Sequence, residues 1–178
     1  MTAMAEGKTY TIHKGKQSLV KTSEEGLERM RKKLEKTAYR IEPVAIIDDV
    51  EFISDTRALD LLSARDSFQC LTSPVVWLTT TTPHERDFAL VEKYIAEKVK
   101  AIVIYGAQAL NMRDQLGKLV EVFRTVTDLK EAVKVCFDLA QANDQVIYSP
   151  GCVVDDGYVN FVDRGRAFEK YVKELKEN

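Results

Sequence analysis

Cys152, His84 and two aspartates could together form a nucleophilic site. Cys152 follows one apolar run of the sequence and His84 follows another, while Asp155 and Asp156 come soon after the cysteine. A thiol nucleophile, an imidazole base and a carboxylate that orients the imidazole would make a hydrolase. The simpler interpretation is a buried cysteine in a tight loop and a histidine that caps a helix. We prefer it, because a triad is defined by a geometry that sequence cannot test.

A run of threonines, Thr79 to Thr82, precedes Pro83. Hydroxyls that follow a buried strand could bind an anion together with the start of the next helix. Such an anion would lie near Arg57 and His84, and the histidine would make its binding depend on pH. A hydroxyl before a helix more often caps that helix, so capping by Thr82 is the preferred interpretation.

The sequence contains no complete motif for a nucleotide or a metal. Gly7-Lys8-Thr9 is similar to the end of a P-loop, but Thr2 stands where the first glycine is needed. The two histidines, His13 and His84, are too few and too far apart for a zinc site. Three cysteines without a close pair indicate no disulfide framework. We therefore expect neither a cofactor nor a metal.

Apolar patterns predict an α/β fold. Strand-like runs cover residues 41–47, 50–54, 75–78, 101–105, 120–123 and 146–148. Helical spacing covers residues 58–68, 88–99, 109–119, 129–139 and 161–175. The first two runs form a hairpin turned at Asp48-Asp49, and the later alternation is typical of a mainly parallel sheet. Such sheets bind ligands at the carboxyl ends of their strands, so the candidate segments are residues 79–86, 106–112 and 149–158.

The N-terminal segment differs from the rest in composition. Residues 1–21 are polar and rich in lysine, and we expect a flexible arm. Residues 22–38 predict an amphipathic helix that begins with a capping box from Thr22 to Glu25. Leu27, Met30 and Leu34 recur at helical spacing and need an apolar surface to cover them. We expect a homodimer through this helix, with folding back onto the same chain as the alternative.

Overall composition excludes several classes of protein. The 178 residues are 45% hydrophobic and 30% charged, as in a single globular domain. The formal net charge of −2 does not favour a nucleic-acid partner. No apolar run approaches the roughly 18 residues of a membrane span, and the first residues lack a secretory signal. We expect a cytoplasmic protein with no nucleic-acid or membrane partner.

The most specific motif lies near the end of the chain. It comprises Ser149-Pro150-Gly151-Cys152, Asn160-Phe161 and Arg164-Gly165, followed by Phe168. This pattern resembles the closing motif of the Mur ligase C-terminal domain, most closely in the member that adds D-glutamate. The resemblance extends back through Tyr39-Arg40-Ile41-Glu42 and covers residues 23–178. It implies a free-standing, Rossmann-like three-layer domain at residues 39–178, preceded by a β-hairpin and an N-terminal helix.

The resemblance also implies where ligands would bind. Arg40 and Asp55 match family residues that contact ATP, while Arg57 replaces a lysine. Other polar family residues are altered: Leu59 replaces a threonine and Val154 a serine. The ligand-binding candidates are Arg40, Asp55, Arg57, Thr80, Thr81, His84, Ser149, Asp156 and Phe161. No residue is assigned a catalytic role.

The Mur ligases join an acid to an amino acid with ATP and magnesium, which a central P-loop domain holds. Because the 22 residues before the helix cannot hold that domain, we expect a degenerate, non-catalytic module that binds a small molecule or a protein, linked to cell-wall precursor metabolism. The alternative is one subunit of a split ligase acting on a UDP-muramoyl precursor, in which a Mur-like partner supplies ATP and magnesium. A Cys-His hydrolase is the third hypothesis. By itself the chain is expected not to bind ATP.

Overall fold

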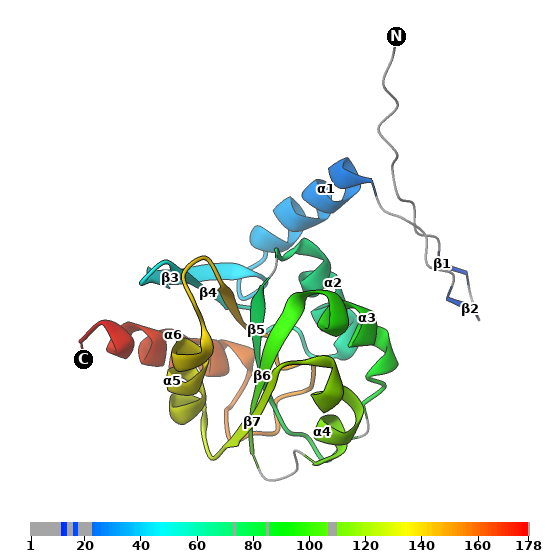
Figure 1. Ribbon diagram of the computed structural model, residues 1–178. Coiled ribbons are helices and arrows are strands. Elements are labelled where there is room, and N and C mark those ends of the chain that lie inside the picture. Colours follow the sequence, from blue (N-terminus) through cyan, green and yellow to red (C-terminus); the bar gives the residue numbers. More distant parts are fainter. Residues whose placement is uncertain are drawn as a thin grey trace.

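A six-stranded sheet with helices on both faces forms the body of the protein (Figure 1). The computed structural model describes residues 12–13, 16–17, 23–72, 74–84, 86–106 and 110–177. The sheet strands are β3 (Glu42–Ile47), β4 (Val50–Ser54), β5 (Val75–Thr80), β6 (Val99–Tyr105), β7 (Val122–Val126) and β8 (Gln145–Tyr148). The helices are α1 (Glu24–Glu35), α2 (Leu61–Cys70), α3 (Ala89–Lys98), α4 (Leu110–Leu116), α5 (Leu129–Leu139) and α6 (Phe161–Glu174).

The order of the strands is β3-β4-β8-β5-β6-β7. β3 and β4 are antiparallel, and every other neighbouring pair in this sheet is parallel. Since strands and helices alternate and both faces of the sheet are covered, the predicted three-layer α/β class is confirmed. β8 lies between β4 and β5, so the chain changes direction across the sheet at the junction of β5 and β8.

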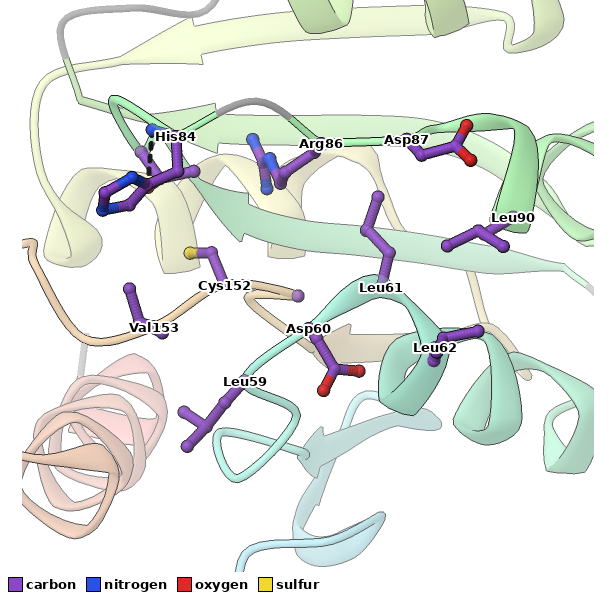
Figure 2. Close-up of a pocket in the computed structure, with 12 residues that line it drawn as sticks. Leu59, Asp60, Leu61, Leu62, His84, Arg86, Asp87, Leu90, Cys152 and Val153 are labelled. Carbon is purple, nitrogen blue, oxygen red and sulfur yellow. Dashed lines mark hydrogen bonds between the residues drawn. The ribbon is translucent and has the colours of Figure 1, made fainter.

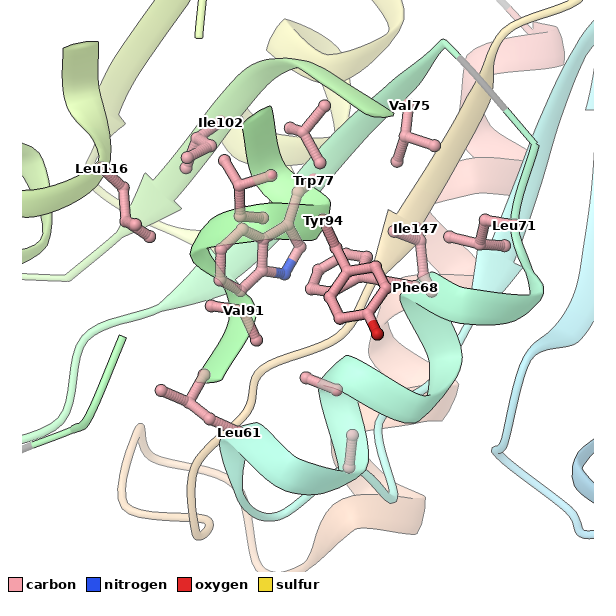
Figure 3. Packing of buried hydrophobic residues seen from close by; sticks show 14 of the residues in the cluster. Leu61, Phe68, Leu71, Val75, Trp77, Val91, Tyr94, Ile102, Leu116 and Ile147 are labelled. Atoms are coloured by element: carbon pink, nitrogen blue, oxygen red, sulfur yellow. The ribbon is translucent and has the colours of Figure 1, made fainter. Parts of the chain in front are cut away.

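Alternate residues of the buried strands face opposite layers. In β5, Val75 and Trp77 pack with α2, α3 and α4, whereas Val76 and Leu78 pack with α5 and α6. Figure 3 shows the first layer, where Trp77 lies edge-on to Phe68 with ring centroids 5.0 Å apart. Because both sides of these strands are buried, their sequences are continuously apolar, which is why the strands were recognisable.

The hairpin of β3 and β4 turns at the predicted residues. Asp48 and Asp49 have φ values of +49° and +61°, and Ile47 pairs with Val50 across the turn. Positive φ at both central residues matches the twist of a two-residue hairpin, and aspartate tolerates this conformation better than most residues.

Several element bounds differ from the sequence expectation. α2 begins at Leu61 instead of residue 58, because the Asp60 carboxylate accepts a hydrogen bond from Ser63 N at 2.7 Å and caps the helix. The helix expected at residues 109–119 ends at Leu116 and continues as a 3-10 turn, Gly117–Leu119. The strand expected at residues 120–123 is therefore displaced to β7, Val122–Val126.

The capping prediction for the N-terminal helix is also corrected. Ser23 is the N-cap of α1, and its hydroxyl accepts a hydrogen bond from Gly26 N at 3.1 Å. With Ser23 as the N-cap, the third helical position is Gly26 and not Glu25, and glycine has no side chain that could complete a capping box. Two short antiparallel strands, β1 (Ile12–His13) and β2 (Lys16–Gln17), precede the helix. The rest of the predicted arm, with Gly7-Lys8-Thr9 and Thr22, lies outside the described residues.

The carboxyl ends of the parallel strands all meet at one edge of the sheet. Asp55 follows β4, Thr81 follows β5, Gly106 follows β6, Thr127 follows β7 and Ser149 follows β8. This edge brings together segments that the sequence singled out. Within the described part of the chain, no helix is both long and apolar enough to cross a membrane.

Candidate functional site

Arg40, Asp55 and Ser149 form a buried network beside the first core layer. Arg40 Nε donates to Asp55 Oδ1 at 2.8 Å, and Ser149 Oγ donates to Asp55 Oδ2 at 2.7 Å. The Arg40 guanidinium also donates to Ser63 O and Ser67 Oγ, both at 3.0 Å. Asp55 has no exposed surface, and its burial raises the pKa of the carboxyl while Arg40 opposes the shift. These polar groups are thus used to connect β4, β8 and α2.

A hydrogen bond between two loops divides the carboxyl edge of the sheet. Thr82 Oγ1, in the β5–α3 loop, donates to Asp155 Oδ2, in the β8–α6 loop, at 2.7 Å. The same Thr82 hydroxyl accepts from His84 N at 3.3 Å. The preferred interpretation of Thr82 as a helix cap is therefore wrong. α3 begins only at Ala89, and its N-cap residue Phe88 makes no side-chain capping bond.

Two pockets contain Thr82. The first, which we call the leucine pocket, has a volume of about 310 Å³ and lies beside α2 (Figure 2). It is lined by Leu59, Asp60, Leu61, Leu62, Thr82, His84, Arg86, Asp87, Leu90, Gly151, Cys152 and Val153. The second, the threonine pocket, has a volume of about 440 Å³ and lies beside α5. It is lined by Thr80, Thr81, Thr82, Pro83, Tyr105, Gly106, Thr127, Asp128, Leu129, Asp155, Asp156 and Tyr158.

Arg86 supplies positive charge to the leucine pocket. Its Nη1 donates to Pro150 O at 3.2 Å, and its guanidinium lies 5.1 Å from the centroid of the Phe88 ring. Burial lowers the pKa of Arg86, but an arginine stays charged at neutral pH. Figure 2 shows His84 and Arg86 on one side of the pocket and Leu59 and Leu62 on the other. The pocket therefore combines apolar walls with a few charged groups, as small-molecule sites usually do.

Cys152 lies in the leucine pocket with His84, but its environment does not activate a thiol. Cys152 is buried, and this burial raises the pKa of the thiol to about 11. Catalytic cysteines need the opposite shift, since the thiolate is the nucleophile. The structure thus brings the first two members of the postulated triad to one pocket and argues against the hydrolase.

A chain of hydroxyl and charged groups lies beneath the threonine pocket. Tyr105 Oη donates to Asp156 Oδ2 and is hydrogen-bonded to Tyr148 Oη. Asp156 Oδ1 accepts from Arg164 Nη1 at 3.4 Å. Burial is the largest cause of the raised pKa of both tyrosines, so both hydroxyls keep their protons at neutral pH.

The candidate residues from the sequence fall into separate groups. Arg40, Asp55 and Ser149 belong to the buried network, and His84 lines the leucine pocket. Thr80, Thr81 and Asp156 line the threonine pocket. Arg57 is exposed and lies over the Phe161 ring at 5.3 Å, and neither of these residues lines the leucine pocket. Arg57 is therefore not among the residues that line the leucine pocket with His84.

Sequence reasoning missed the roles of Arg86, Tyr105 and Arg164. Arg164 has no exposed surface and donates to Thr56 O at 3.1 Å and Cys152 O at 3.4 Å, which ties two loops of the site together. A signal was present, because Arg164 belongs to the closing motif after Asn160-Phe161. Arg86 lies at the end of the candidate segment 79–86 but was not singled out within it, and no signal marked Tyr105. Among the described residues, no cluster of three metal-binding side chains occurs.

The strand order and the helices on both faces define a three-layer α/β domain with a mainly parallel sheet. Escherichia coli FolC in complex with ADP shares the fold, with a TM-score of 0.54 and 16% identity over 80% of this chain and 33% of FolC. A murein peptide ligase from Psychrobacter arcticus does so with a TM-score of 0.53 and 10% identity over 79% of this chain and 29% of that protein. At such identities these likenesses establish the fold alone.

Sequence comparison identifies the family. The UDP-N-acetylmuramoylalanine–D-glutamate ligase of Caldicellulosiruptor saccharolyticus is 31% identical over 150 residues, which are 84% of this chain and 33% of the relative. The corresponding ligase of Bacteroides fragilis is 30% identical over 138 residues, 77% of this chain and 31% of the relative. No protein-family model matches the chain. The chain is thus a Mur ligase C-terminal-like domain, and it spans about a third of the length of these relatives.

Proposed function

We propose that this domain is a non-catalytic, ligand-binding member of the Mur ligase family, linked to cell-wall precursor metabolism. The observation that carries the proposal is the leucine pocket, which has apolar walls and charged groups at the carboxyl edge of the sheet. In open α/β sheets this edge is the usual place for a ligand. The junction of β5 and β8, where the chain changes direction, lies between the two loops that line the pocket.

The nature of the lining favours an amino acid with an apolar side chain. Leu59, Leu61, Leu62, Leu90 and Val153 offer an apolar surface, which favours burial of a hydrocarbon group. Arg86 and His84 can bind a carboxylate, and Asp60 and Asp87 can bind an ammonium group. A protein segment that presents a leucine side chain is the other occupant with this chemistry.

The buried network supports a non-catalytic role. The resemblance implied that Arg40 and Asp55 contact ATP, yet Asp55 is fully buried and bonded to Arg40 and Ser149. A nucleotide would have to compete for these groups with intramolecular hydrogen bonds.

The proposal is tested by nuclear magnetic resonance on the intact, ¹⁵N-labelled chain. Leucine of either hand, added at millimolar concentration, should shift the amide signals of Leu61, Cys152 and Val153, and D-glutamate should shift them less. Leu62→Asp should abolish the response, because it puts a carboxylate on the apolar wall. Ile46→Asp is the matched control, since Ile46 is 66% exposed on β3 and lines neither pocket. The proposal fails if leucine leaves these amides unmoved or if both variants respond alike.

A subunit of a split ligase is the second candidate. It is favoured by the 31% sequence identity to a ligase named for D-glutamate addition. A Mur-like partner would then supply the parts that bind ATP and magnesium, and the substrate would be a UDP-muramoyl precursor. Calorimetric titration with Mg-ATP separates the two functions. No heat at micromolar concentration is expected, whereas tight binding, or ATP hydrolysis in the presence of a Mur-like protein, would favour the split ligase.

A further inference from the structure

The threonine pocket is separate from the site proposed above. The Thr82–Asp155 hydrogen bond lies between it and the leucine pocket, and Thr82 is the one residue that lines both among those the structure describes. Its walls come from the carboxyl ends of β5, β6 and β7, from the start of α5 and from the β8–α6 loop. Its volume of about 440 Å³ is within the range of roughly 300–1,000 Å³ that is usual for small-molecule sites.

Many of the residues that line this pocket carry a hydroxyl group. Thr80, Thr81, Thr82, Thr127, Tyr105 and Tyr158 all line it. Tyr158 is half-buried, and this burial raises the pKa of its phenol to about 12, so the hydroxyl is protonated at neutral pH. Thr80, Thr82, Thr127 and Tyr105 already donate their hydroxyl protons within the chain. Their hydroxyl oxygens can still accept hydrogen bonds from a ligand. Such a surface suits a ligand that has hydroxyl groups of its own.

Gly106 allows this wall to form. Its φ is +106°, and a Cβ at this position would lie 2.1 Å from Thr81 Oγ1. A residue with a side chain would therefore displace the Thr81 hydroxyl. The positive φ also favours glycine at this position.

The charged groups of the pocket are acidic. Asp128 and Asp155 are exposed at its wall, and the described lining residues include no lysine, arginine or histidine. Asp156 differs, because Arg164 Nη1 lies 3.4 Å from its Oδ1 and compensates its charge. The α5 N-terminus does not favour an anion here, since Asp128 Oδ1 already accepts from Glu131 N at 2.9 Å. A positively charged group is therefore attracted and a phosphate is repelled.

We propose that the threonine pocket binds a compact, hydroxylated amine of sugar-like size. The ammonium group lies near Asp128 and Asp155, and the hydroxyls of the ligand bond to the threonine and tyrosine hydroxyls. Asp155 uses Oδ2 for its bond to Thr82, and among the described residues no group bonds its Oδ1. This inference does not depend on the function proposed for the leucine pocket.

Three probes have the same pyranose ring but differ in charge: glucosamine, glucose and glucose 6-phosphate. Each is titrated at millimolar concentration into the intact ¹⁵N-labelled chain, at a slightly acidic pH at which the amine is charged. Glucosamine should shift the amide signals of Gly106, Leu129 and Tyr158, and added salt should weaken its binding. Glucose should bind more weakly and glucose 6-phosphate should cause no shift at these amides.

Two variants test the residues. Asp155→Asn keeps an acceptor for Thr82 but removes the charge, and should weaken glucosamine binding by about fivefold. Tyr158→Phe keeps the ring and should weaken it by about threefold, as expected for the loss of one hydrogen bond. Asp87→Asn in the leucine pocket is the matched control and should bind as the unchanged chain does. The proposal is overturned if glucosamine causes no shift, if glucose 6-phosphate binds equally well, or if the folded Asp155→Asn and Tyr158→Phe proteins bind glucosamine normally.

Discussion

Arg164 shows how one buried side chain can organise the site. Its guanidinium bonds to carbonyls of the β4–α2 and β8–α6 loops and pairs with Asp156. The neighbouring Gly165 makes this approach of α6 feasible, because a Cβ there would lie 2.5 Å from the Tyr39 ring and 2.8 Å from Thr56 Oγ1. The arginine and the glycine of the closing motif therefore act together, one by bonding two loops and one by leaving space for the helix.

At Cys152, the raised pKa predicts slow reaction with an alkylating reagent. A pKa of about 11, against 9.0 for an ordinary cysteine, lowers the thiolate fraction at neutral pH by about a hundredfold. Iodoacetamide should therefore label Cys152 about a hundredfold more slowly than free N-acetylcysteine in the same tube. The rate should rise about tenfold per pH unit until the pH approaches 11. Peptide mass spectrometry after timed quenching measures both values.

The free thiol in each sample is the internal control for the reagent. Labelling of Cys152 as fast as that of N-acetylcysteine at neutral pH would contradict the argument from burial. It would also restore the hypothesis of a Cys-His hydrolase, because an activated nucleophile must be available as thiolate.

At the scale of elements, α2 forms one wall of the leucine pocket and is held at both ends. The Asp60 carboxylate caps its start. At its other end, Lys98 Nζ donates to Phe68 O at 2.8 Å, Gln69 O at 3.3 Å and Leu71 O at 2.7 Å. A lysine suits this position, because the last carbonyls of a helix have no partner within the helix and carry partial negative charge.

Lys98→Met should loosen the end of α2 while keeping the aliphatic part of the side chain. We expect the free energy of unfolding to fall by about 2 kcal/mol, since charged hydrogen bonds to these carbonyls are lost. Urea denaturation measures this change, and hydrogen exchange should show faster exchange in the last turn of α2. Lys93→Met on the exposed face of α3 is the control and should change the free energy by less than ~0.5 kcal/mol. Equal effects of the two substitutions would refute the capping role.

At the scale of the whole molecule, the apolar face of α1 is only partly covered. It packs against α2, and Leu34 joins the partly buried residues of the first core layer. Leu27 and Met30, one or two turns earlier, are only half-buried. In Figure 1, the start of α1 extends away from the sheet. Folding back onto the chain thus covers one end of the helix more fully than the other.

We still expect a homodimer through the half-covered part of α1. Sedimentation of the intact chain at tens of micromolar should give a dimer, because a second copy can cover Leu27 and Met30. Leu27→Asp with Met30→Asp should give a monomer, since this change places carboxylates in the apolar contact. Leu34 is unsuitable for this test because it packs on the core of its own chain.

A charge exchange on the same helix controls for effects on the helix itself. Glu28 and Lys32 form an exposed ion pair at 3.5 Å, so Glu28→Lys with Lys32→Glu keeps the pair and should leave the dimer intact. If the unchanged chain sediments as a monomer, the dimer prediction is wrong, and the packing of α1 on its own chain takes its place.

The amino-acid sequence by itself determined the class and order of the elements. Strands such as β5 and β6 are apolar on both faces, and helices such as α5 repeat apolar residues at helical spacing, so each pattern arises from burial within a short segment. The closing motif likewise identified the family, because its residues are adjacent in the chain. The bounds of α2 and β7 were less certain, because a cap such as Asp60 changes a helix start without changing the apolar pattern.

Only the tertiary structure decided what the polar residues do. Arg40, Asp55 and Ser149 are far apart in sequence, and their mutual bonds exist because β4 and β8 are neighbours in the sheet. Thr82 and Asp155 are also far apart in sequence, and only the fold brings them within hydrogen-bond distance. Their bond lies between two pockets that no local sequence pattern predicts. The spacing of apolar residues along the sequence encodes which side of an element is buried. A polar group, in contrast, can form a hydrogen bond with any partner that the fold brings within about 3 Å. The topology of the whole chain determines which partner that is.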